Sequence, residues 1–134
     1  MNNSPYILIM AGGVGSRFWP ASREHLPKQF LDITGSGKSL IRQTVDRFLG
    51  FIPLDHIFII THKNYGDLVQ QAIPELSRHQ IIEEPSRNNT AASIALASMK
   101  LSKLDPDATC IVAPADHVIT DEQEFRRVIH LAFL

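Results

Sequence analysis

The stretch with the clearest chemical potential combines a glycine-rich turn with two cations that follow it. Gly12, Gly13 and Gly15 fill three of four consecutive positions, and Arg17 and Lys28 come after them. Glycines let the backbone approach a ligand closely and direct its N–H groups at an anion. Arginine can grip phosphate oxygens with two parallel hydrogen bonds, and lysine adds a compact positive charge. The combination indicates a phosphate-binding loop, whereas the glycines taken alone would also suit a flexible turn.

Two familiar phosphate-binding patterns do not fit this chain. A dinucleotide-binding Gly-x-Gly-x-x-Gly pattern that begins at Gly13 would need glycine where Phe18 stands, which disfavours an NAD-binding oxidoreductase. A P-loop ending in the Gly-Lys-Ser of residues 37–39 would need glycine where Asp32 stands. We therefore interpret residues 35–39 as an ordinary turn before a helix that its serine caps.

Two carboxylates follow other apolar runs. Asp116 lies just beyond one run, and a carboxylate there can bind Mg²⁺, which takes one or two carboxylates together with phosphate oxygens and water. A simple turn aspartate is the alternative. Glu84 ends another run and is a candidate base contact or a solvated strand end. Asn89 and Thr90 open an alanine-rich segment, so they are candidate ligand contacts, helix caps, or both.

Alternating strand and helix patterns must position these side chains. Short apolar runs, continuous rather than alternating, predict strands covered on both faces. The expected strands are residues 6–11, 57–61, 80–83 and 109–113, and the expected helices are residues 39–51, 65–76, 89–104 and 122–134. This order predicts an α/β fold, a three-layer Rossmann-like open and mostly parallel sheet with helices on both faces. Ligands in such sheets bind beyond the carboxyl ends of the strands, which is where the candidate residues lie.

Four smaller expectations follow from local patterns. Thr120 and Gln123 fit a capping box at the start of the last helix, and either Asn88 or Asn89 could cap the alanine-rich helix. Cys110 lies inside an apolar run, so we expect an inert core thiol. Trp19 could cover the glycine loop, although we favour structural packing. His117 could orient Asp116 or support the turn.

Three motifs together resemble the sugar-phosphate nucleotidyltransferases. They are Gly-Gly-Val-Gly-Ser-Arg-Phe-Trp-Pro with the later Pro-Lys-Gln-Phe, then Glu-Pro-Ser-Arg-Asn-Asn-Thr-Ala, then Pro-Ala-Asp-His-Val-Ile. The Pro-Lys-Gln-Phe form is similar to that of mannose-1-phosphate guanylyltransferases. In the second motif Asn88 stands where the family has arginine, with Arg87 one residue earlier, and Ala92 replaces a proline.

The resemblance implies a role for each matching residue. It implies a nucleotidyltransferase (GT-A-like) domain whose catalytic residues are Arg17, Lys28 and Asp116, with Asp116 as the Mg²⁺ ligand. The residues implied to bind nucleotide are Ala11, Gly12, Gly13, Gly15, Arg17, Lys28, Glu84, Pro85, Asn89 and Thr90. A carboxylate such as Glu84 can accept both N1–H and the 2-amino group of guanine, which discriminates by about 1–3 kcal/mol.

The resemblance also implies a reaction, in which GMP passes from GTP to mannose 1-phosphate to give GDP-mannose and pyrophosphate. One alternative is a nucleotidyltransferase for another nucleoside triphosphate and hexose 1-phosphate, and a second is a non-catalytic nucleotide-binding regulatory subunit. We expect residues 1–134 to be the amino-terminal, nucleotide-binding portion of a catalytic domain truncated at its carboxyl end. Sugar contacts and a second metal ligand would then lie beyond Leu134, and the fragment alone would show little turnover.

Composition narrows the class of protein further. The chain has 134 residues, is 44% hydrophobic and carries a net charge of −1, as expected for one globular domain that does not bind nucleic acid by bulk charge. Its single cysteine excludes an internal disulfide and suits a reducing compartment. No apolar run approaches the length of a membrane span, so we expect a cytoplasmic protein without membrane contact. A homo-oligomer is compatible with the sequence.

Overall fold

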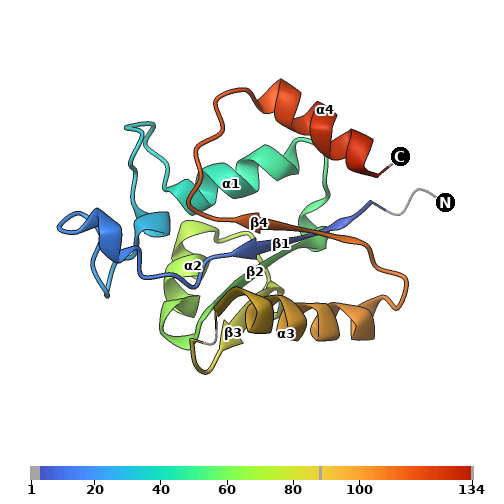
Figure 1. Ribbon diagram of the computed structural model, residues 1–134, viewed down its shortest axis with the longest axis horizontal. Helices are drawn as coiled ribbons and strands as arrows, with labels where there is room; N and C mark the ends of the chain where they lie inside the picture. The colour runs from blue at the N-terminus through green and yellow to red at the C-terminus, as the bar shows by residue number, and fades with distance from the viewer. Residues whose placement is uncertain (1–3, 88, 134) are drawn as a thin grey trace.

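Four parallel strands form one open sheet at the centre of the molecule. The computed structural model describes residues 4–87 and 89–133. The strands are β1 (Tyr6–Met10), β2 (Ile57–His62), β3 (Ile81–Glu84) and β4 (Cys110–Pro114), in the spatial order β3-β2-β1-β4. Each neighbouring pair is parallel, and β1 pairs with both β2 and β4. All four carboxyl ends therefore meet at one edge of the sheet, on the left of Figure 1.

Helices cover both faces of the sheet and complete the three layers. They are α1 (Leu40–Leu49), α2 (Gly66–Ala72), α3 (Asn89–Leu104) and α4 (Glu122–Ala132). Figure 1 shows α1 and α4 on one face and α3 on the other, and α2 packs into the same apolar cluster as α1. The predicted three-layer α/β fold is confirmed. No helix among the described residues combines the length and hydropathy that crossing a membrane requires.

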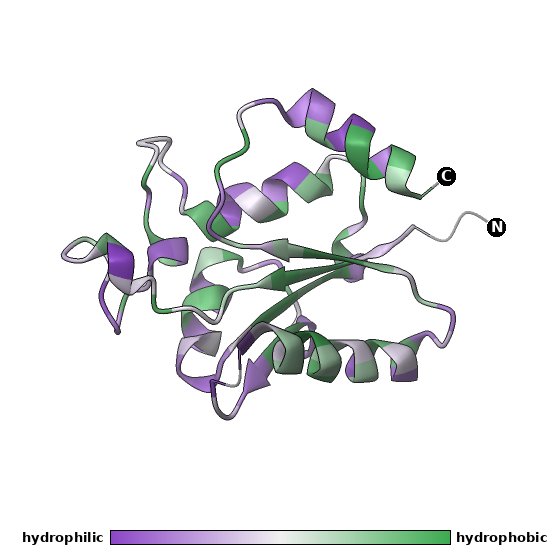
Figure 2. Ribbon diagram, viewed as in Figure 1, coloured by the Kyte–Doolittle hydropathy of each residue, from purple (hydrophilic) through white to green (hydrophobic). Residues whose placement is uncertain are grey.

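Alternation along the inner strands sends apolar side chains into two cores. Ile7 and Ile9 of β1 pack with Val45 and Phe48 of α1, whereas Leu8 points the other way. Leu8 joins a second cluster with Phe58, Ile60, Ile82 and two residues of α3, Ala97 and Leu101. Because both faces are covered, the central positions of β1 and β2 are continuously apolar, and Figure 2 draws these strands largely in green.

The edge strand β4 departs from the expected burial. Its residues alternate between exposed and half-buried, and Cys110 is exposed, so the expectation of a buried core thiol is wrong. The physical reason lies in the strand order. β4 is the outer strand, and the cluster formed by α3 takes its sheet residues from β1, β2 and β3. The face of β4 that carries Cys110 is therefore open.

Local capping explains where the helices begin. Ser39 caps α1 by accepting the N–H of Arg42 at 3.4 Å, as predicted. The Oδ1 atom of Asp121 accepts the N–H of Glu124 at 2.9 Å, so α4 is capped one residue later than the expected box at Thr120. Asn89 begins α3 with φ of 63°, and the alternative cap Asn88 lies outside the described residues.

Candidate active site

A cavity of about 350 Å³ opens at the carboxyl ends of the strands and collects most of the predicted site residues. Its walls come from the end of β2 and from the segments that follow β1, β3 and β4. The predicted residues among its lining are Ala11, Gly12, Gly13, Gly15, Glu84, Asn89, Thr90 and Asp116. This volume lies within the range of about 300–1,000 Å³ typical of small-molecule sites. Three motifs that are far apart in the sequence thus border one cavity.

Side chains hold the carbonyl groups of the glycine loop in place. The buried amide of Gln29 donates to the carbonyl oxygens of Ala11 and Gly13, each at 2.9 Å. Thr61 donates to the same Ala11 oxygen at 2.8 Å. Ser22, also buried, donates to the carbonyl of Val14 at 2.7 Å. The loop is therefore a fixed structure, and not a flexible turn.

This arrangement of carbonyls leaves amide groups free to bind an anion. In a trans peptide the N–H points opposite to the carbonyl. The amide of Gly12 therefore points away from Gln29 and Thr61, that of Val14 away from Gln29, and that of Gly15 away from Ser22. Within residues 4–87 and 89–133, none of these three amides donates to a protein acceptor. Successive free N–H groups form a concave site suited to phosphate.

Lys28 lies beside this loop at the rim of the cavity. Gly15 has φ of 68°, and a Cβ atom there would lie 2.8 Å from the Cβ of Lys28, so the glycine lets the two segments pack closely. The ammonium of Lys28 is 3.9 Å from Oδ2 of Asp116 and 5.4 Å from the centre of the Phe18 ring. Lys28 is not among the lining residues, but its charge is adjacent to one of them.

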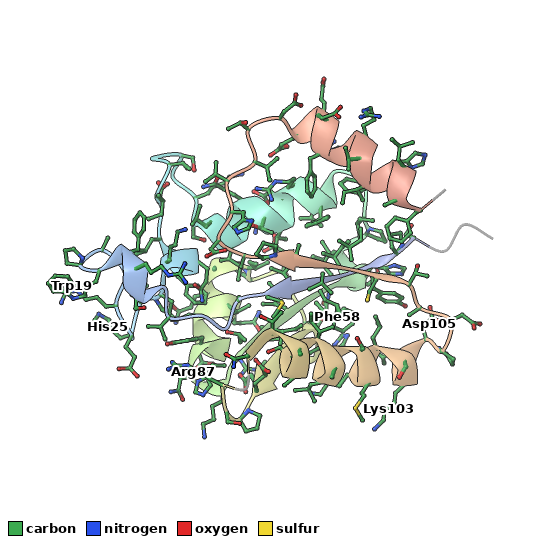
Figure 3. The ribbon with its side chains drawn as sticks, viewed as in Figure 1. Trp19, His25, Phe58, Arg87, Lys103 and Asp105 are labelled. Atoms are coloured by element: carbon green, nitrogen blue, oxygen red, sulfur yellow. The ribbon has the colours of Figure 1, made fainter. Side chains whose placement is uncertain are left out.

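Arg17 and Trp19 lie on the outer part of the same loop. Arg17 is exposed in a short 3₁₀ turn (Ser16–Phe18), is not part of the cavity wall, and its side chain pairs with no other described residue. Trp19 is 72% exposed, so the expectation that it packs structurally is wrong. Figure 3 shows Trp19 at the tip of the protruding loop, where too few neighbours surround it to cover an indole.

The carboxylate of Glu84 lies at the inner end of the cavity. Its residue is only 8% exposed, and Oε1 accepts a 2.6 Å hydrogen bond from the hydroxyl of Ser93 on α3. Oε2 lies 3.6 Å from the point where a Cβ on Gly12 would sit. The alternative of a solvated strand end does not describe this residue. Pro85 follows it but is exposed and outside the cavity wall.

Asp116 is the carboxylate at the opposite side of the cavity. Its side chain is 43% exposed, and its two oxygens lie 3.9 Å from Lys28 Nζ and 3.7 Å from His117 Nε2. No cluster of three or more His, Cys, Asp or Glu side chains occurs in the described part of the chain. Asp116 is thus a single carboxylate beside Lys28 and His117, and one carboxylate can serve a metal that takes its other ligands from substrate oxygens and water, as Mg²⁺ can.

Hydrogen bonds through Tyr65 connect the loop that contains Arg87 with the loop that contains Glu24, near the cavity. Arg87, which lines the cavity, donates to the Tyr65 hydroxyl at 2.9 Å. That hydroxyl donates to the carbonyl of Glu24 at 2.9 Å, and the Arg87 guanidinium lies 5.8 Å from the centre of the Tyr65 ring. Arg87 is labelled in Figure 3 beside the carboxyl ends of the strands. The departure from the family motif thus still places an arginine at the site.

Sequence reasoning missed several residues that build the site. They are Ser22, Gln29, Thr61, His62 and Ser93. Gln29 carried a usable signal, since it stands inside the Pro-Lys-Gln-Phe motif and is a polar residue beside a cation. Ser93 carried little sequence signal, because a serine within an alanine-rich helix does not by itself indicate a functional role.

Comparison with known proteins identifies the family. The nucleotidyl transferase family profile matches residues 6–132, so the chain belongs to the nucleotidyl transferase family. The alginate biosynthesis protein AlgA of Pseudomonas putida is 39% identical over 127 residues, covering 93% of this chain and 26% of that protein. The mannose-1-phosphate guanylyltransferase of Escherichia coli is 37% identical with the same coverage. The chain spans about a quarter of the length of the curated relatives it matches.

Solved structures agree with this assignment. A Thermus thermophilus protein described as a mannose-1-phosphate geranyltransferase superposes with a TM-score of 0.80 at 30% identity. That match covers 95% of this chain and 36% of the other. A Helicobacter pylori protein described as a mannose-6-phosphate isomerase gives a TM-score of 0.73 at 26% identity, covering 97% of this chain and 46% of the other.

Proposed function

We propose that this chain supplies the nucleotide-binding part of a mannose-1-phosphate guanylyltransferase. The reaction transfers GMP from GTP to mannose 1-phosphate and gives GDP-mannose and pyrophosphate. The observation that carries the proposal is the meeting of the free loop amides, the buried Glu84 and the exposed Asp116 in one cavity. The similarity to proteins named mannose-1-phosphate guanylyltransferase supports the choice of sugar and nucleotide.

Charge determines how these residues would act. A phosphate oxygen of mannose 1-phosphate forms a bond to the α-phosphorus of GTP while the bond to the bridging oxygen breaks, and pyrophosphate leaves with that electron pair. Both reactants are anions, so cations and N–H donors must offset their repulsion. The amides of Gly12, Val14 and Gly15 would hold phosphate oxygens, and Lys28 and Arg17 would contribute positive charge.

Glu84 and Asp116 would have different tasks. The buried Glu84 carboxylate would accept the two adjacent N–H donors of guanine, whereas a pyrimidine such as uracil or thymine would place acceptors beside it. Asp116 would hold Mg²⁺, which, when bound, neutralises phosphate charge and polarises the phosphoryl group. His117 lies 3.7 Å from the same carboxylate and would help to orient it.

The proposed cellular location of the reaction depends on the cysteine content of the chain. The one cysteine of the chain is a free thiol, which suits a reducing compartment, so we place the reaction in the cytoplasm.

Pyrophosphate release tests the reaction directly. GTP and a panel of sugar 1-phosphates should be assayed on this chain and on any longer gene product that contains it. We expect mannose 1-phosphate with GTP to give the highest rate. A higher rate with another nucleoside triphosphate or another hexose phosphate would overturn the proposed substrates and favour a different nucleotidyltransferase.

Replacing Lys28 separates an enzyme from a binding subunit. Lys28→Ala should reduce turnover severely, because the lysine would act on charge that develops during transfer. Lys38→Ala is the matched control, since Lys38 pairs with Asp46 away from the cavity. If the longer gene product shows no turnover and Lys28→Ala lowers only its nucleotide affinity, the chain is better described as part of a nucleotide-binding regulatory subunit.

A further inference from the structure

Glu84 is an unusual carboxylate because it is buried without a cation. Among the described residues, no lysine, arginine or histidine lies within ion-pair distance of it, and the hydroxyl of Ser93 is the one side-chain donor to it. A carboxylate has about four acceptor positions, so most of its capacity is unused in the protein. Glu84 lines the cavity, so a ligand that brings N–H donors there would satisfy the unfilled acceptors.

The hydroxyl of Ser93 has two acceptors within reach but only one proton to donate. Oε1 of Glu84 lies 2.6 Å away, and the carbonyl oxygen of Asn89, one helical turn back, lies 3.0 Å away. The bond to the carboxylate is the shorter one and is charge-assisted, so it is favoured over the bond within the helix. The proton of Ser93 therefore points at Glu84.

This bond fixes the plane of the carboxylate. Ser93 is itself 94% buried, so its hydroxyl is held firmly against Oε1. With Oε1 anchored on α3, Oε2 is turned toward Gly12 and the glycine loop. Gly12 has no side chain to cover it. The two oxygens of Glu84 are thus oriented before any ligand arrives, which lowers the entropic cost of binding a matched pair of donors.

We propose that Ser93 is a positioning residue that sets the base preference of the cavity by fixing the orientation of Glu84. The inference rests on the proposed function, in which Glu84 reads the base. Without the hydroxyl, the carboxylate can rotate away from the position in which it accepts both donors of guanine. Contacts to the phosphates come from other elements, so loss of Ser93 should weaken selection of the base and leave phosphate binding unchanged.

Dissociation constants for GTP and ATP, measured on this chain by isothermal titration calorimetry, test the proposal. Ser93→Ala should weaken GTP binding about tenfold, the size expected from losing one charge-assisted hydrogen bond, while ATP binding stays within about twofold. Ser102→Ala is the matched control, because Ser102 lies on the same helix, is exposed and bonds only to the carbonyl of Met99. That variant should leave both constants unchanged.

A double-mutant comparison separates this inference from the proposed function. Glu84→Gln should remove the GTP preference, and Ser93→Ala added to it should have no further effect. If Glu84→Gln leaves the preference intact, the proposed base contact fails. If Glu84→Gln removes the preference but Ser93→Ala does not reduce it, only the positioning role fails. Equal weakening of GTP and ATP by Ser93→Ala would show a purely structural serine and would also overturn the inference.

Discussion

Individual glycines of the glycine-rich loop after β1 have different physical roles. Gly15 has a positive φ, and any Cβ there would lie 2.8 Å from Lys28, a separation that real Cβ atoms do not adopt. Gly13 has nothing within 4 Å of its Cβ direction and no positive φ. One glycine is needed for the shape of the loop, and the other is not.

Two Gly→Ala variants make this difference measurable. We expect Gly15→Ala to lower the free energy of unfolding by about 1–2 kcal/mol, the cost of a left-handed residue with a side chain, and to displace Lys28. Gly13→Ala should change it by less than about 0.5 kcal/mol. Urea denaturation of both variants gives the comparison. Equal destabilisation by the two variants would contradict this account.

At the scale of single residues, the sequence predicts the charged side chains that could act on a ligand. It misses the residues whose role depends on contacts with distant parts of the chain. Glu84 and Asp116 stand at or just beyond the ends of strands, and an acidic residue at the end of an apolar run can be recognised in the sequence itself. Gln29 is different, because its amide bonds to carbonyls 16 and 18 residues away. Ser93 likewise matters only because α3 places it against the end of β3. The Pro-Lys-Gln-Phe motif draws attention to Gln29, but the partners of Gln29 and Ser93 cannot be read from the neighbouring residues.

Asp46 on helix α1 makes the stability of the fold depend on pH. Burial tends to raise the pKa of Asp46, but hydrogen bonds from Arg42 and Lys38 outweigh it and lower the pKa below its ordinary value. Such a carboxylate stabilises the fold fully above its unfolded-state pKa, and this contribution is lost as the pH falls through the lower, folded-state value. Asp46 thus favours folding at neutral pH and ceases to do so in acid.

Asp46→Asn tests this linkage. The variant should be less stable than the wild type at pH 7, by about 1 kcal/mol or less for a partly exposed ion pair. The difference should shrink as the pH falls below about 4, where the wild-type carboxylate becomes protonated. Urea midpoints across this range measure it. Asp107→Asn, at an exposed aspartate whose side chain pairs with no described residue, should show no such trend.

Helix α4 is attached to α1 through few side chains. The Phe125 ring meets Phe48 edge-on at 5.5 Å and lies 5.5 Å from the Arg47 guanidinium. Arg126 lies over the ring of Phe51 at 5.7 Å. None of the described residues of α4 is buried. We therefore expect α4 to open more readily than α3, which buries Ser93, Ala97 and Leu101.

Phe125→Ala should loosen the attachment of α4 to α1. The cost should be about 2 kcal/mol, below the 3–5 kcal/mol of a fully buried phenylalanine, because Phe125 is half-buried. Hydrogen exchange should accelerate in α4 and not in α3. Val128→Ala is the control on the same helix, since Val128 is 50% exposed and should cost less than about 0.5 kcal/mol. Similar exchange in both variants would show that Phe125 does not anchor the helix.

Element types follow from the sequence more reliably than their place in the sheet. The expected bounds of α3, 89–104, coincide with the structure, because an alanine-rich run has strong helix propensity along its whole length. The run at 109–113 correctly predicts a strand but wrongly predicts burial of Cys110. Apolar composition cannot distinguish a central strand from an edge strand, since the order β3-β2-β1-β4 is set by pairing between distant segments.

At the scale of the whole molecule, one cavity is shared by all four strands of the sheet or the segments that follow them. A ligand bound there contacts the loops after β1, β3 and β4 together, so binding should stabilise the fold as a unit. GTP at about 100 times its dissociation constant should raise the free energy of unfolding by about 2.7 kcal/mol. ATP at the same concentration should raise it less, and Glu84→Gln should remove the difference. Identical shifts with both nucleotides in the wild type would argue against base selection by Glu84.

The exposed indole of Trp19 also has a consequence for spectroscopy. It is the only tryptophan of the chain, and it is already largely in water when the protein is folded. Its fluorescence should therefore change little on unfolding, although circular dichroism would show the full transition. Because unfolding changes this emission little, a change seen in the folded protein would report on the surroundings of Trp19. Because Trp19 stands on the loop that begins with Gly12, Gly13 and Gly15, we expect its emission to change when nucleotide is added.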